Sequence, residues 1–130
     1  MLVKSSKGPW IACDLDKTLA TYPPKHGQVI GDPIPNVVQR MKKYLREGKT
    51  VKIFTARVGP PRTQTEISTF TYALDTWCNK VFGQTLPVTC TKDHFVEEIW
   101  DDRAVQVVPN TGEILEDTVE MLKRQLKAKQ

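Results

Sequence analysis

The segment 10–18, Trp-Ile-Ala-Cys-Asp-Leu-Asp-Lys-Thr, places two aspartates directly after a short apolar run. Because alternate side chains of an extended backbone point to the same side, Asp14 and Asp16 should project together, with Leu15 on the other side. Two carboxylates held close together repel each other, so the arrangement needs a cation or a shared proton. A lone Asp-x-Asp can equally be a loop cap, and the rest of the chain has to decide between the two interpretations.

Further polar positions each follow a predicted strand, and they are Thr55, Lys92 and the pair Asp101-Asp102. The carboxyl ends of parallel strands meet at one edge of a sheet, where open α/β sheets bind ligands. We therefore expect these residues to lie near Asp14 and Asp16. Together they supply a carboxylate nucleophile, a second carboxylate, a hydroxyl, an ammonium group and an acidic pair. That set is what metal-assisted phosphoryl transfer through an aspartyl phosphate needs.

The elements that must position these residues alternate between strands and helices. Apolar runs predict strands over 10–15, 51–54, 86–90, 99–100 and 105–108. Helical spacing predicts one helix from Asp32-Pro33 to Gly48, a second from Pro61 to Gly83 and a third over 115–126. Residues 21–35 should form a loop or flap, and 95–98 a brief helical turn. This alternation implies a parallel sheet with right-handed crossovers.

The composition is that of a soluble single domain. The chain has 130 residues, of which 39% are hydrophobic and 26% are charged. No apolar run approaches the roughly 20 residues of a membrane span, and we expect no secretory segment. Three isolated cysteines indicate neither zinc nor a disulfide framework, so we expect a cytoplasmic protein. The net charge of +4 is a mild bias that helps an anionic substrate.

The motif order Asp-Leu-Asp-Lys-Thr, Phe-Thr-Ala-Arg, a lysine and Trp-Asp-Asp-Arg-Ala-Val resembles the haloacid dehalogenase superfamily of phosphatases, particularly its small phage and bacterial members. The resemblance covers nearly the whole chain. It implies a three-layer, Rossmann-like α/β fold with a mostly parallel central sheet, in one domain over residues 1–130. The segments between the motifs are too short for a cap domain, so the site should be open. Lys17 stands where the family commonly has glycine.

The resemblance also implies a role for each residue. Asp14 would attack phosphorus, and Asp16 would act as general acid and then as general base. Thr55 would hold the phosphoryl oxygens, and Lys92 would neutralise their charge. Further contacts to the substrate phosphate would come from Leu15, Thr18, Ala56 and Arg57.

The implied cofactor is Mg²⁺, held by Asp14, the carbonyl of Asp16 and the acidic pair. Within the pair, Asp102 would be the direct ligand, and Asp101 would brace Lys92 or a metal-bound water. Each assignment has a structural alternative: Thr55 or the acidic pair as caps, and Lys92 as a surface lysine. Arg57 is either a substrate contact or a structural ion pair.

The leading hypothesis is a capless, Mg²⁺-dependent phosphatase acting on a phosphomonoester, with the 21–35 flap providing selectivity. An open site suits a large substrate, such as a nucleic-acid phosphate end or a phosphoprotein. It suits a small phosphomonoester if neighbouring subunits of a homo-oligomer enclose the pocket. Two alternatives remain: a phospho-switch resembling a response-regulator receiver, and a catalytically silent module that binds nucleic acid or a protein partner. Salt-sensitive nucleic-acid binding without phosphate release would favour the silent module.

Overall fold

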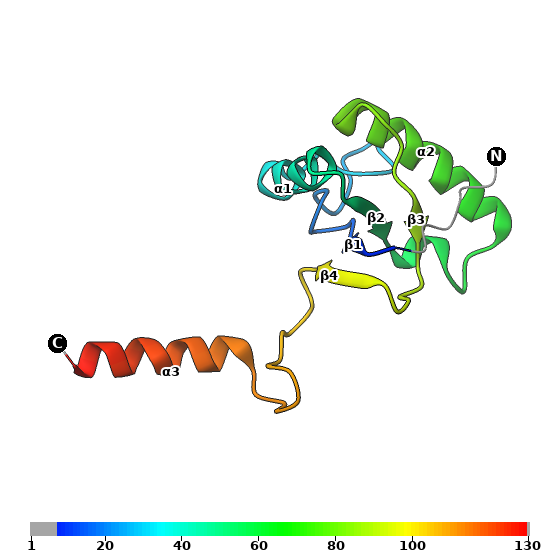
Figure 1. Cartoon of the computed structure of the whole chain (residues 1–130). Helices are drawn as coiled ribbons and strands as arrows, with labels where there is room; N and C mark the ends of the chain where they lie inside the picture. Colours follow the sequence, from blue (N-terminus) through cyan, green and yellow to red (C-terminus); the bar gives the residue numbers. More distant parts are fainter. Residues whose placement is uncertain (1–7, 130) are drawn as a thin grey trace.

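A four-stranded, all-parallel sheet is the centre of the computed structural model, which describes residues 8–129 (Figure 1). Its strands, in the spatial order β3-β2-β1-β4, are β1 (Trp10–Cys13), β2 (Thr50–Phe54), β3 (Val88–Thr89) and β4 (Val96–Trp100). β1 pairs with both β2 and β4, so the residues that follow β1 lie in the middle of the carboxyl edge. The predicted α/β class and parallel sheet are confirmed, and the topology is compatible with a Rossmann-like fold.

One apolar cluster joins the sheet to the helices α1 (Pro35–Arg46) and α2 (Gln64–Phe82). Alternate residues of the two central strands enter this cluster, as the period of two along a strand requires. They are Ile11 and Cys13 of β1 and Val51 and Ile53 of β2. The helices contribute Val38, Met41, Tyr44, Phe70, Leu74 and Cys78. The cluster fixes the ends of β1 and β2, from which the polar residues of the site project.

The helix boundaries follow local chemistry. α2 begins with a capping box, in which Thr63 and Glu66 each accept from the other's backbone N–H, and it ends at Gly83 with φ 73°, as predicted. α1 begins at Pro35, later than the predicted Asp32-Pro33 start. Asp32 does not cap the helix, because its carboxylate forms an ion pair of 2.7 Å with Lys25.

Two local predictions are wrong. Residues 95–98 do not form a helical turn, because 96–98 belong to β4 and pair with β1, with a register shift opposite Trp10 and Ile11. Residues 105–108 do not form a strand of the sheet. Val107 instead makes an isolated antiparallel bridge with Ile114, and β4 remains the edge.

The predicted C-terminal helix is confirmed as α3 (Leu115–Ala128). It extends away from the sheet and from the other two helices at the end of the segment 101–114 (Figure 1). No residue of α3 is buried, and it is not in extensive contact with any other element. Within residues 8–129, no helix has the length and apolar character needed to cross a membrane.

Candidate active site at the carboxyl edge of the sheet

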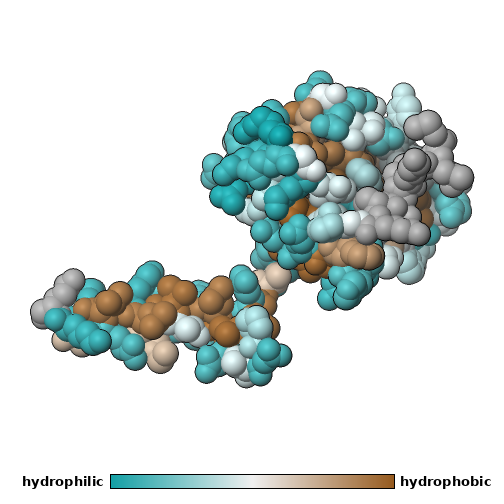
Figure 2. Space-filling view, in the orientation of Figure 1, coloured by the Kyte–Doolittle hydropathy of each residue, from teal (hydrophilic) through white to brown (hydrophobic). Residues whose placement is uncertain are grey.

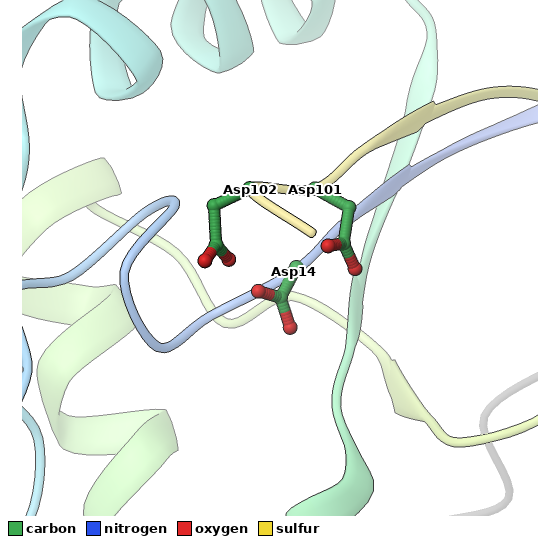
Figure 3. Close-up of side chains that lie close together, drawn as sticks. All are labelled: Asp14, Asp101 and Asp102. Carbon is green, nitrogen blue, oxygen red and sulfur yellow. The ribbon is translucent and has the colours of Figure 1, made fainter. Parts of the chain in front are cut away.

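Three carboxylates meet where β1 and β4 end. Cys13 pairs with Trp100, so the residues that follow, Asp14 and Asp101, are neighbours, and the Asp14 N–H donates to the Trp100 carbonyl at 2.9 Å. Asp102 completes the group, and one oxygen from each carboxylate lies within 4.8 Å of the others (Figure 3). The structure therefore brings together the first aspartate and the acidic pair, which are 87 positions apart in the chain.

Thr18 connects two of these carboxylates. Its hydroxyl lies 3.2 Å from Asp14 Oδ2 and 3.0 Å from Asp102 Oδ1, and it accepts the Asp102 backbone N–H at 3.0 Å. Thr18 is 7% exposed, so these contacts are partly buried even though Asp102 itself is exposed. The hydroxyl was predicted to contact the substrate phosphate, but here it holds the two acidic segments together.

The environment of Asp14 disfavours negative charge. Burial and, to a smaller extent, the negative charge of Asp101 together raise the pKa of Asp14 from 3.8 to about 6. Hydrogen bonds from the Thr18 hydroxyl and the Leu15 N–H act in the opposite direction. Asp102 differs, since its hydrogen bonds hold its pKa below the usual range despite some desolvation. A bound cation would therefore offset surroundings that disfavour the negative charge of Asp14.

Asp16 has a cation partner of its own. The Arg57 guanidinium donates from Nε to Asp16 Oδ2 at 2.8 Å and from Nη2 to Oδ1 at 2.6 Å. Such a bidentate pair fixes both the position and the plane of the carboxylate. Arg57 also donates from Nη1 to the Val29 carbonyl in the 21–35 flap and lies 5.2 Å from the centre of the Phe70 ring. Of the two predicted roles for Arg57, the structural ion pair is the one seen here.

The turn that follows β1 needs a left-handed residue. Lys17 has φ 73°, which is the conformation that glycine adopts most easily and which costs about 1–2 kcal/mol for other residues. The turn is closed by N–H groups of residues 18–20 that donate to the Leu15 carbonyl. The Leu15 side chain is fully buried, so only its backbone could reach a substrate.

Thr55 lies at the end of β2 and is 5% exposed. Its hydroxyl accepts the Arg57 N–H at 3.2 Å and caps the short 3₁₀ helix η1 (Ala56–Val58). The capping alternative is therefore correct, and the predicted contact to phosphoryl oxygens remains a prediction, because both Thr55 and Ala56 line the adjoining pocket.

A pocket of about 950 Å³ opens onto this edge. Its lining combines the acidic Asp14, Asp16 and Asp101 with four cationic side chains. These cations are Lys17, Arg57, Arg62 and Arg103. The flap contributes Tyr22, Pro24 and Val29 to the same pocket. A pocket lined by both acidic and cationic side chains suits an anionic ligand that is bound together with a metal ion.

Of the four predicted catalytic residues, Lys92 is the one that does not line the pocket. It is exposed. Asp101 does not brace it, since the Asp101 carboxylate accepts the Arg103 N–H at 2.7 Å.

The sequence reasoning missed two contacts: the Thr18 connection to Asp102 and the Arg57 connection to Asp16. Each joins motifs 41 or more positions apart, so spacing alone gave no signal for them. The pocket cations Arg62 and Arg103 were also missed as site residues. Arg103, next to the acidic pair, was the one that motif position could have indicated.

Comparisons with known proteins add little. No family model matches the chain, and no curated protein matches it. Among solved structures, a conserved protein from Bacteroides thetaiotaomicron aligns over 91% of this chain and 92% of its own, with 18% identity and a TM-score of 0.49. Its description names no activity, and a likeness at this level carries no argument about function.

Proposed function

We propose that the chain is a metal-dependent phosphatase of the haloacid dehalogenase type, acting on a phosphomonoester. The observation that carries this proposal is the convergence of Asp14, Asp101 and Asp102, because Asp14 and Asp101 line a pocket that Asp16 and several cations also line. The three-layer, capless form of the fold belongs to the same proposal.

The residues present fit a divalent cation. Three carboxylates whose oxygens lie within 4.8 Å of one another match the hard oxygen ligands that Mg²⁺ prefers, and burial together with the negative charge of Asp101 raises the pKa of Asp14. Asp14, Asp101 and Asp102 would hold the ion, with the Asp16 carbonyl as the further predicted ligand. When bound, Mg²⁺ would neutralise negative charge on the nucleophile and on the phosphoryl group.

The chain's own residues would carry the reaction in two steps. First, an Asp14 oxygen forms a bond to phosphorus while the bond to the leaving oxygen breaks, and Asp16 gives that oxygen a proton. Second, a water molecule attacks the same phosphorus, Asp16 takes its proton, and the bond from Asp14 to phosphorus breaks to release phosphate. Arg57 would position Asp16 between these steps, and the Asp16 oxygen that carries the proton would release its hydrogen bond from the guanidinium during each proton transfer.

The positive groups around the pocket would bind the phosphoryl oxygens. Lys17 and Arg103 lie in its lining together with Thr55, whereas Lys92 does not. A test of Lys92→Ala therefore separates two forms of the proposal. Loss of phosphate release by about 100-fold or more would mean that Lys92 enters the site during catalysis, and a small change would assign charge neutralisation to the lining cations.

The decisive experiment measures phosphate release from nucleotides, sugar phosphates and 5′- or 3′-phosphorylated oligonucleotides, with Mg²⁺ and with chelator. Asp14→Asn should abolish release, and the matched variant Asp117→Asn, on the exposed α3, should leave it unchanged. Mg²⁺-dependent release that survives Asp14→Asn would contradict the proposed nucleophile. No release from any substrate by a folded, Mg²⁺-binding protein would favour the binding-module alternative, and salt-dependent nucleic-acid binding would then be measured.

A further inference from the structure

α3 carries an apolar stripe that no other helix or strand within residues 8–129 buries. The stripe consists of Leu115, Val119, Leu122 and Leu126. Val119, Leu122 and Leu126 are 40%, 50% and 66% exposed, and the apolar surface runs along the helix in Figure 2. A soluble monomer usually carries no contiguous apolar patch above about 300–600 Å². An exposed helix with such a stripe is therefore expected to have a partner.

The spacing of the stripe is that of a helix pair. Its residues follow one another at intervals of four, three and four, which is the a and d pattern of a left-handed coiled coil. The pattern continues over the whole of α3, whose 14 residues span about 21 Å. A partner helix of the same length could therefore contact the entire stripe.

The charges on α3 indicate the direction of that partner. The acidic residues Glu116, Asp117 and Glu120 lie in its first half, and the basic residues Lys123, Arg124 and Lys127 lie in its second half. Two parallel copies would place like charges side by side. Two antiparallel copies place the acidic half of each helix beside the basic half of the other. Their helix dipoles then point in opposite directions, so the positive end of each helix lies beside the negative end of the other.

We propose that α3 is a self-association helix through which two copies of this chain pair in antiparallel fashion about a two-fold axis. In this arrangement Val119 of each copy packs against Leu122 of the other, and Glu116 lies beside Lys123 on one flank of the stripe. The interface is isologous, as two-fold symmetry requires. A nucleic-acid partner is disfavoured because the three carboxylates in the first half of the same helix would lie near the phosphate backbone and repel it.

The size of the interface sets its strength. Two short stripes bury on the order of 1,000 Å² in total, which is at the low end for specific interfaces. The dimer should therefore dissociate on dilution, with a Kd on the order of micromolar. Because α3 extends away from the sheet whose carboxyl edge carries the pocket (Figure 1), association should leave the pocket accessible.

Sedimentation equilibrium of the full chain over about 1–300 μM tests this proposal. The wild type should pass from monomer to dimer, and Leu122→Glu should raise the Kd by about tenfold or more, because it places a charge in the apolar seam. Met121→Glu is the matched control: Met121 is 51% exposed on the same helix but lies outside the stripe, so its Kd should stay near that of the wild type. Unchanged thermal unfolding would show that both variants are folded.

Charge exchange tests the direction. Glu116→Lys and Lys123→Glu should each weaken homodimers, and an equimolar mixture of the two should form heterodimers, because antiparallel pairing then places opposite charges together. A monomer at every concentration, whether α3 is free or folded back on its own domain, would overturn the proposal. So would a dimer that is insensitive to Leu122→Glu, or one that Met121→Glu disrupts equally.

Discussion

Asp14→Asn should make the metal-free protein more stable at neutral pH, even though it removes the proposed nucleophile. Burial raises the pKa of Asp14 to about 6 in the folded state, from 3.8 in the unfolded chain. The folded state therefore binds the proton more tightly, and stability contributed by this group is present below pH 4 and lost as the pH rises through 6. A difference of about two pKa units corresponds to roughly 3 kcal/mol in the free energy of unfolding.

Solvent around a half-buried carboxylate reduces this figure, and we expect a gain of about 1–2 kcal/mol for Asp14→Asn above pH 7. The assay is urea unfolding in chelator at several values between pH 4 and 8. The gain should shrink towards pH 4, because protonated aspartic acid and asparagine are both neutral. A variant less stable than the wild type at pH 7.5, or a gain that is independent of pH, would refute the reasoning.

Two controls strengthen this experiment. Asp93→Asn should act with the opposite sign, because hydrogen bonds from Trp10 and the Phe95 N–H hold the pKa of Asp93 below its usual range. Its contribution is present above the unfolded pKa and is lost as the pH falls, so Asp93→Asn should be less stable at neutral pH. Mg²⁺ should raise the melting temperature of the wild type and have little effect on Asp14→Asn. An equal rise in both would place the cation elsewhere.

Three further substitutions test contacts around the site. Thr18→Val should lower the free energy of unfolding by about 1–2 kcal/mol and weaken Mg²⁺ binding measured by calorimetry, because a buried hydroxyl that joins two acidic segments is lost. Arg57→Lys should reduce phosphate release by about tenfold or more while a melting curve shows a folded protein, because a lysine cannot hold both oxygens of Asp16. Gly31→Ala should destabilise the flap, as seen by faster proteolysis there, because its Cβ would lie 1.9 Å from the Thr21 carbonyl oxygen; equal proteolysis would contradict this.

The sequence predicted the parallel sheet and the residues at its carboxyl edge because both depend on local patterns. Apolar runs that end in polar residues identified β1 and β2, and Gly83 identified the end of α2. β4 was harder, because it is an edge strand in which Glu97 and Glu98 replace the apolar alternation. Glu98 accepts hydrogen bonds from the Tyr44 hydroxyl and the Trp100 indole, and these are contacts that only the folded chain supplies.

The partner of each site residue could not be predicted, because partners come from distant segments. The sequence could not decide between the two roles of Arg57, because the choice depended on the direction of the Asp16 side chain at the start of the turn that contains Lys17. Lys92 was predicted as a site residue from its place in the order of the motifs. That order does not determine whether a loop directs a side chain into the pocket, and Lys92 does not line it.

The two aspartates of the Asp-x-Asp motif end in opposite electrostatic environments, although one residue separates them. Asp16 is paired with a guanidinium, whereas Asp14 faces Asp101 and Asp102. When neighbouring titratable groups are placed in such different surroundings, their chemical roles differ too. The negative charge that lacks a cation lies entirely on the Asp14 side. A divalent cation should therefore bind between β1 and β4, next to Asp14, and leave the ion pair between Asp16 and Arg57 intact.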